Sequence, residues 1–385
     1  MVYLRGVRSI HPLVPFPLDH PHPHHIQWVL SPEGGVRLGG RHSPGIMSQL
    51  AVDPSLPLQR DPMITAAVSK LLLNTNRDSL RHFHVDSPLT EEAREVVCKL
   101  PDLCGLRVII EGSTSLPTMI LPNLSEIEVE YDRDRGWLGG FRGATLGRLN
   151  SITFCATSKS AQIADFLEAL ESVGLTTSTT LSTFMFYTAY PWRPNYRTLL
   201  SFKQLRALEI EFSCEGGCSS TMDDDIITDL ARAMPKLEFL RFGKEPCGNP
   251  TGVTAKGLAV LAHCCPNLSA FSIHFRVDSL CALPATSRTP HTGSTAPRRD
   301  CAVMGLYVGG IRIPEESVLV VALTMVRMFP HISWIRYDDE NWGKVLDAIC
   351  LSREIVGCSS KEYSLTTPRS NLSDTYPGAM LERGG

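Results

Sequence analysis

Residues 121–129 read LPNLSEIEV, and this pattern decides the fold because it recurs along the chain. Position 1 of the pattern is apolar, position 2 is often Pro and position 4 is Leu. Positions 7 and 9 are apolar, and the remaining positions take any residue. The last two apolar side chains lie on the same face of a short strand, and the Leu three positions earlier lies in the turn before it. Pro in second position cannot continue a preceding helix, so the pattern predicts a helix-to-strand boundary. Complete copies start at Leu100, Leu121, Leu146, Phe202, Met234, Cys265 and Phe329.

The spacing of the copies indicates a repeat in which some members are weaker. Successive starts lie 21, 25, 56, 32, 31 and 64 residues apart, and the two long gaps are about twice a single step. Weaker copies fill both gaps and another lies upstream, which gives about ten units in the size range of leucine-rich repeats. Their apolar residues are Leu80, Phe83 and Val85, then Leu181, Phe184 and Phe186, then Val303, Leu306 and Val308.

Segments with a helical period of apolar residues lie between the strands. Several begin with Thr or Asp and carry acidic residues in the first turn, where the unpaired amides and the positive dipole end favour them. We therefore expect the acidic triplet that starts at Asp223, and Thr254, to cap helices. The helical segments start at Thr90, Ala161, Asp223, Thr254, Glu315 and Trp342.

A single strand–helix unit cannot bury both faces of its strand, so the units must stack. The sequence therefore predicts an α/β fold, a leucine-rich-repeat-like (ribonuclease-inhibitor-like) solenoid of about ten irregular strand–helix units. We expect three regions. Residues 1–62 form a Pro-, His- and Gly-rich irregular segment, with a partial first repeat near Val7 and Ile10; residues 63–358 form the repeat region, with an inserted loop at 282–300; residues 359–385 form a disordered tail.

Composition and charge exclude several classes of protein. The formal net charge is -3, so the chain has no broad positive field for nucleic acid or for an acidic membrane surface. No stretch approaches the roughly 18 apolar residues of a membrane span, and the first residues do not read as a signal peptide. We expect a soluble protein of the cytoplasm, the nucleus or both, without nucleic-acid or membrane partners.

The 12 cysteines suggest buried thiols rather than disulfides or zinc ligands. Most lie at apolar positions of the periodic segments, as Cys98, Cys104, Cys155 and Cys350 do. Cys214 and Cys218 are four residues apart, but no second pair at zinc-finger spacing accompanies them.

The chain lacks the familiar signatures of catalysis. The glycine-rich residues 136–147 lead into a repeat strand instead of a helix, and residues 248–257 lack the ending of a P-loop. The HPHPHH run at 20–25 fits a solvated segment better than a metal site. We expect no enzyme activity, cofactor or metal. An α/β enzyme with an unrecognised site stays open as an alternative, and a reversal of strand order with a deep cleft would favour it.

Function in such a sheet depends on the residues that alternate with the buried ones, because they face the open, concave side. Tyr, Trp and Arg among them are typical anchors of a protein-binding surface. The predicted positions are His82, His84, Arg107, Glu126, Glu128, Thr153, Met185, Tyr187, Glu209, Glu211, Arg241, His274, Tyr307, Trp334 and Arg336.

Two stretches carry a family resemblance. Residues 213–268, which include SCEGGCSSTMDDDIITDLARAMPKLEFLRF and TGVTAKGLAVLAHCCPNL, resemble fungal F-box proteins with leucine-rich-repeat-like regions. IPEESVLVVALTMVRMFP at 313–330 is similar to the same group, and the resemblance extends over residues 80–362. It implies a subunit of a cullin-RING ubiquitin ligase in which the repeats hold the target and an F-box binds the Skp1 adaptor.

The resemblance and the pattern together predict a non-catalytic protein-binding scaffold, the target-recognition part of an F-box-type (SCF) ubiquitin-ligase subunit. Residues 1–62 do not read as an F-box, so we expect binding to a Skp1-type adaptor only if a fuller chain supplies one. A repeat-only interaction scaffold outside ubiquitination is the alternative. The identity of the protein target is not predicted.

Overall fold

A computed structural model gives the fold of the chain. The structure describes residues 27–30, 36–39, 49–51, 62–74, 80–110, 117–131, 141, 144–156, 171, 180–188, 196–212, 222–243, 252–282, 301–309 and 311–355.

The centre of the fold is an 11-stranded sheet in which the strands follow one another in chain order. Every neighbouring pair is parallel, so the predicted α/β class is confirmed. Each of the ten copies of the sequence pattern is a strand of this sheet, from β4 to β13. The strands are β3 (Gln49–Ala51), β4 (His82–Pro88), β5 (Gly105–Ile110), β6 (Glu126–Tyr131), β7 (Ser151–Ala156), β8 (Thr183–Thr188), β9 (Ala207–Phe212), β10 (Phe239–Phe242), β11 (Ala270–Ser272), β12 (Gly305–Gly309) and β13 (Trp334–Tyr337).

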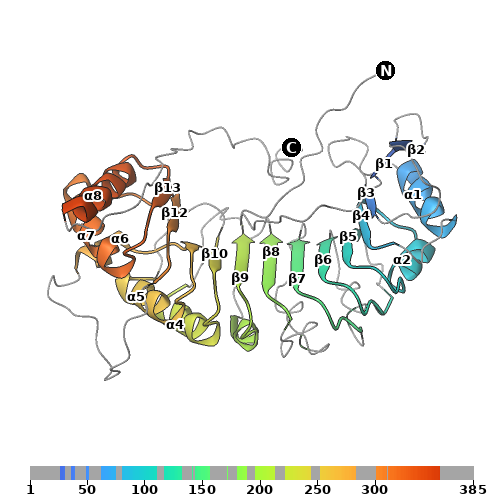
Figure 1. The fold of residues 1–385 in the computed structure, drawn as a ribbon, viewed down its shortest axis with the longest axis horizontal. Helices are drawn as coiled ribbons and strands as arrows, with labels where there is room; N and C mark the ends of the chain where they lie inside the picture. The colour runs from blue at the N-terminus through green and yellow to red at the C-terminus, as the bar shows by residue number, and fades with distance from the viewer. Residues whose placement is uncertain are drawn as a thin grey trace, which may run out of the picture.

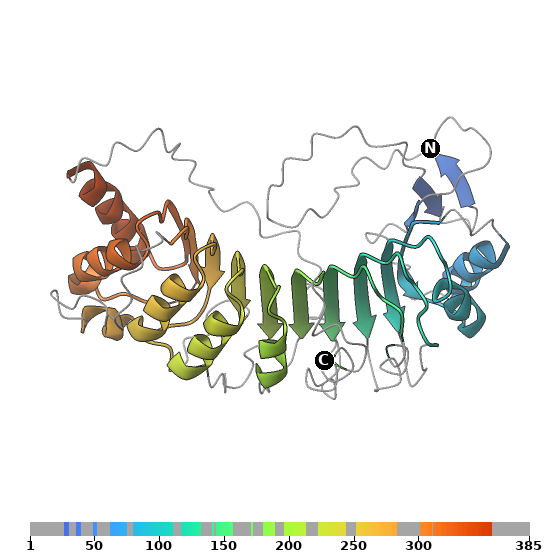
Figure 2. The same ribbon diagram turned by 60° about the horizontal axis from the view of Figure 1, so that its bottom comes forward.

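The helices cover one face of the sheet and leave the other open. Figures 1 and 2 show the strands side by side along an arc, with the helices on its outer side, so the open face is concave. The predicted helices are present except the one from Ala161, of which only Glu171 lies within the described residues. The helices are α1 (Pro62–Asn74), α2 (Glu91–Val97), α4 (Asp224–Ala233), α5 (Ala255–Cys264), α6 (Val277–Cys281), α7 (Val318–Met328) and α8 (Asn341–Ile355), with 3₁₀ turns η2 (Tyr196–Ser201) and η3 (Glu315–Ser317).

The N-terminal segment contains more regular structure than its composition predicts. β1 (Gln27–Leu30) and β2 (Val36–Gly39) form an antiparallel pair, and β3 extends the main sheet beyond β4. These strands are three or four residues long, too short for an alternating pattern to stand out among the Pro and Gly residues. The partial repeat expected near Val7, the tail at 359–385 and residues 283–300 of the predicted insert lie outside the described residues.

The core is built from apolar rows that run across the strands. The Leu position of the pattern is at most 1% exposed in every unit from β4 to β13. The next apolar position is also buried in each of these units, and strand pairing aligns its members directly across the sheet. Replacing such a side chain with Ala typically costs about 2–5 kcal/mol. The first row is Leu80, Leu103, Leu124, Leu149, Leu181, Leu205, Leu237, Leu268, Val303 and Ile332; the second is Phe83, Leu106, Ile127, Ile152, Phe184, Leu208, Leu240, Phe271, Leu306 and Ile335.

The same backbone arrangement joins each unit to the next. The carbonyl of Cys104, just before β5, accepts hydrogen bonds from the amides of Ser125 (2.7 Å) and Glu126 (3.0 Å). The Ser125 hydroxyl donates to the same oxygen at 2.9 Å, and Ser182, Ser269 and Ser333 donate in the same way at their steps. The carbonyls that accept two successive amides of the next unit are those of Arg81, Cys104, Ser125, Asn150, Ser182, Arg206, Glu238, Ser269 and Met304.

Most of the described cysteines are buried or partly buried in these units, as expected. Cys98, Cys265 and Cys301 are buried. Cys350 is exposed, so its predicted burial is wrong. It lies on α8 after the last strand, where no further unit stacks among the described residues to cover that side of the helix.

Capping residues fix the start of two adjacent helices. Asp223 caps α4, as predicted, by accepting the Ile226 amide at 2.9 Å. Asp224 does more than support its own helix, because its carboxylate accepts the Thr254 amide (2.8 Å), the Thr254 hydroxyl (2.6 Å) and the Gly257 amide (3.0 Å). A Cβ at position 257 would collide with this carboxylate, so a larger residue there would displace Asp224 from its hydrogen bonds. One acidic residue thus ties α4 to α5.

Asp224→Ala should lower the free energy of unfolding by about 2 kcal/mol, because it removes charged hydrogen bonds to the start of α5. Urea denaturation measures this change. The neighbouring Asp225→Ala is the control, since Asp225 is exposed in the same helical turn. Equal loss in both variants would contradict the bridging role.

Candidate functional site

The candidate site is the open face of the sheet, whose side chains alternate with the buried rows. The burial pattern of β7 shows this alternation, with Ile152, Phe154 and Ala156 buried and Ser151 and Thr153 half-buried. All of the predicted contact positions lie on strands of the main sheet except His274, which follows β11. Strand pairing places Arg107, Glu128, Thr153, Met185, Glu209, Arg241, Tyr307 and Arg336 in one row across the face, together with His84 and Ser272.

Arg241 organises the middle of the open face. Its guanidinium contacts the carboxylates of Glu209 at 2.8 Å and Glu211 at 3.4 Å. Glu209 is only 7% exposed, so it serves the internal ion pair and is not free to contact a partner. Burial raises the pKa of the Glu209 carboxyl above its usual range, and Arg241 opposes that rise. Tyr187 packs beside these groups, and burial raises the pKa of its hydroxyl as well.

The stretch from β5 to β10 has an excess of negative charge. Arg107 pairs with Glu128 at 3.4 Å, while the Glu126 side chain is exposed on the same strand. Across these six strands the open face carries five carboxylates, from Glu126, Glu128, Glu130, Glu209 and Glu211, against the guanidinium groups of Arg107 and Arg241. Small or neutral residues lie between the two acidic strands: Ser151, Thr153, Cys155, Thr183, Met185 and Tyr187.

His84 and His274 are neutral at physiological pH. Burial lowers the pKa of His84 to about 4, and the neighbouring His82 and Arg107 lower it further. Burial also lowers the pKa of His274 to about 4. His82 and His84 lie edge to face with their ring centres 6.3 Å apart, above Gly105, which leaves room for the His82 ring. His84 and His274 therefore do not offset the acidic stretch.

Aromatic side chains gather at the C-terminal end of the open face. Trp334 and Tyr307 form an edge-to-face pair with ring centres 4.9 Å apart. Trp334 lies over Gly305, where any added side chain would collide with the indole ring. The indole remains 37% exposed, and Arg336 and Tyr337 on the same strand are also exposed. This end offers a large, fixed aromatic surface beside a positive charge.

Sequence reasoning missed Glu130, Cys155 and Tyr337 as open-face or exposed positions. The first two continue the alternation of β6 and β7 by one further step, so the same rule identifies them. Tyr337 lies beyond a register shift between β12 and β13, which the repeat pattern does not reveal.

Comparisons with known proteins give no family assignment: no protein-family model matches the chain, and no curated protein matches it either. Within the described part of the chain, no helix has the length and apolar character to cross a membrane. The same residues contain no group of three or more His, Cys, Asp or Glu side chains arranged to hold a metal ion.

Glu209→Gln should become more stable relative to the wild type as the pH rises above about 4.3, the ordinary pKa of glutamate. The folded protein holds the Glu209 proton more tightly than the unfolded chain does, so wild-type stability falls as that proton leaves. Urea midpoints over a pH series test this. Glu126→Gln, at an exposed site, is the control. If the stability of the wild type instead rose relative to that of Glu209→Gln with increasing pH, attraction to Arg241 would outweigh burial.

Proposed function

We propose that the chain is a non-catalytic protein-binding scaffold, a leucine-rich-repeat-like (ribonuclease-inhibitor-like) solenoid whose open face holds a protein partner. The strand order supports this proposal, because parallel strands follow one another in sequence without the reversal at which open α/β enzymes bind ligands. The repeated carbonyl contact and the apolar rows also support stacking of equivalent units.

The observation that carries the proposal is the exposed surface formed by the acidic strand β6 and the aromatic strand β13 on one concave face. An acidic face favours a partner segment with Lys or Arg side chains, since complementary charge speeds association and excludes acidic competitors. A fixed, partly exposed Trp beside Tyr and Arg is typical of the residues that contribute most to binding energy.

The partner would cross both regions in extended form. Neighbouring strands lie about 4.8 Å apart, so β6 and β13, seven steps apart in the sheet, are separated by about 34 Å along the face. An extended chain covers that distance in about ten residues. The partner segment therefore has a basic residue about ten positions from an apolar or aromatic residue.

Following the resemblance of residues 213–268, we place the chain as the target-recognition part of an F-box-type (SCF) ubiquitin-ligase subunit. The described part of this stretch comprises α4, β10 and α5, with Asp224 joining the two helices. It lies within the repeat region, which in the resembling proteins holds the target. In this proposal the open face selects the protein to be modified.

A photo-crosslinking residue at Thr183, half-buried on the open face, should capture the partner, whereas one at the exposed Arg232 of α4 should not. With that partner purified, Trp334→Ala should weaken binding about 30-fold, the effect of removing a dominant contact. Glu126→Lys with Glu128→Lys should mainly slow association and reduce its salt dependence.

Glu92→Lys with Glu316→Lys is the matched control, because both carboxylates are exposed away from the open face. Unchanged affinity in Trp334→Ala and in the Glu126 and Glu128 reversal would reject this surface. Melting curves for each variant show that the fold is retained.

Adaptor binding is tested separately from target binding. Mixed with a purified Skp1-type adaptor, residues 1–385 should not form a complex, because the repeats are proposed to bind the target and not the adaptor. Gel filtration measures this result. A tight complex would show that an adaptor-binding element lies within these residues.

A further inference from the structure

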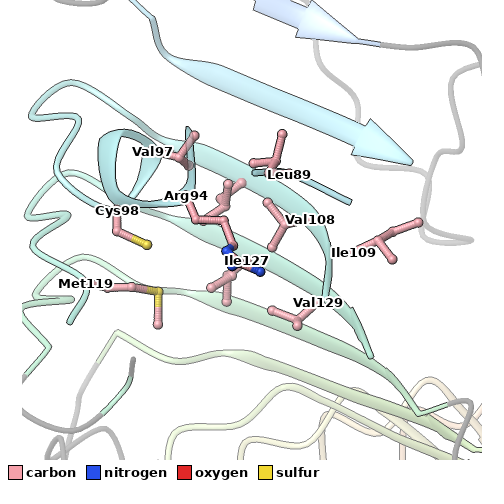
Figure 3. A pocket seen from close by; sticks show the side chains of 10 residues that line it. Leu89, Arg94, Val97, Cys98, Val108, Ile109, Met119, Ile127 and Val129 are labelled. Carbon is pink, nitrogen blue, oxygen red and sulfur yellow. The ribbon is translucent and has the colours of Figure 1, made fainter. Parts of the chain in front are cut away.

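The inner face of the helical layer packs against the sheet. Figure 3 shows this packing where Arg94 and Val97 of α2 lie over Val108 and Ile127 of the strands. The cavity between them has room for about one molecule the size of water, so it does not hold a larger ligand. The outer face of the helices, in contrast, is open to other molecules.

The outer face of α7 is apolar, unlike that of α4 and α5. Leu319, Val320 and Leu323 of α7 are 62%, 42% and 45% exposed. Figure 1 shows this helix on the outer side of the arc near its C-terminal end. Contiguous exposed apolar side chains on a folded chain mark a surface that meets another molecule. The exposed residues of α4 and α5 are instead polar: Asp225, Asp229, Arg232, Lys256 and His263.

Leu351 of α8 extends this apolar surface. Lys344 near the start of α8 pairs with Glu315 just before α7 at 2.7 Å, so this side of α8 lies beside α7. Leu351 follows Lys344 by seven residues, about two helical turns, and therefore lies on the same side of α8. It is 58% exposed. We call the surface formed by Leu319, Val320, Leu323 and Leu351 the α7 patch.

Charged residues lie at the two ends of the α7 patch. Glu316 is exposed in the turn before α7, and Arg327 is exposed in the last turn of the helix. Glu316 precedes Leu323 by seven residues and Arg327 follows it by four, so all three lie on one side of the helix. The patch therefore has an acidic end and a basic end, about 16 Å apart along the helix axis.

We propose that the α7 patch is the contact between two copies of this chain, packed with their α7 helices antiparallel about a two-fold axis. Such a contact brings the same surface of each copy together, so that surface must complement itself. In the antiparallel arrangement Glu316 of each copy faces Arg327 of the other, and the apolar side chains meet between these pairs. A parallel arrangement would place like charges opposite each other, which is unfavourable.

The size of the patch sets the strength of this contact. Four apolar side chains cover less than the roughly 800 Å² per partner of a standard stable interface, so we expect a dissociation constant on the order of 10–100 µM. The dimer leaves the open face of each copy uncovered, because α7 lies on the outer side of the arc. Self-association is therefore independent of the proposed partner binding.

Sedimentation equilibrium of residues 1–385 over a concentration series tests the proposal. The wild type should change from monomer to dimer between about 1 and 300 µM. Leu323→Glu should stay monomeric, because it places a carboxylate in the centre of the contact. Glu316→Arg and Arg327→Glu should each weaken the dimer about tenfold, since like charges then face each other. The variant that carries both changes should recover the wild-type constant.

Arg232→Glu is the matched control, because Arg232 is the exposed arginine in the last turn of α4 and should not affect the dimer. Recovery in the double variant shows that unfolding does not cause the loss in the single variants. A wild type that is monomeric throughout the series would overturn the proposal. So would a dimer that persists in Leu323→Glu, or single-variant losses that the double variant does not restore, because another surface would then form the contact.

Discussion

The contact on which the rest of the structure depends is the carbonyl that precedes each strand and accepts two successive amides of the next unit. It satisfies backbone groups that would otherwise be buried without partners as the chain turns into the strand. It also fixes the register, so that the second apolar position of each strand lies directly opposite that of the next strand. A slip of one residue would turn both apolar rows toward solvent. Irregular spacing between strands is tolerated because the intervening segments do not share this contact.

The same constraint creates the two unlike faces of the sheet. Since the helices lie on one side, every second strand residue is left on a face that no described element covers. Charge is held on this face by pairing across neighbouring strands, as Arg241 does with Glu209 and Glu211. We propose that the side chains that remain exposed on this face, acidic on β6 and aromatic on β13, form the binding surface. Rigidity of the sheet would hold both regions ready for a partner.

The sequence predicted the strands well because a nine-residue pattern carries both a period and a turn signal. It could not predict how side chains reach between units. Asp224 was expected to support its own helix, and its bonds to the start of α5 depend on how the helices stack. Glu209 was correctly placed on the open face, but its burial results from the neighbouring strands β8 and β10. Arg94 occupies a helix position that faces the core, against its polarity, so the pattern did not predict its burial.

Oxidative footprinting of the chain with its captured partner tests the central claim of an open-face binding surface most directly. We predict that binding protects Met185, Tyr307 and Trp334 from oxidation while Leu319 and Leu323, which are exposed on α7, react as before. Protection of Leu319 and Leu323 with no change at Trp334 and Met185 would contradict it, because the partner would then bind the helical side.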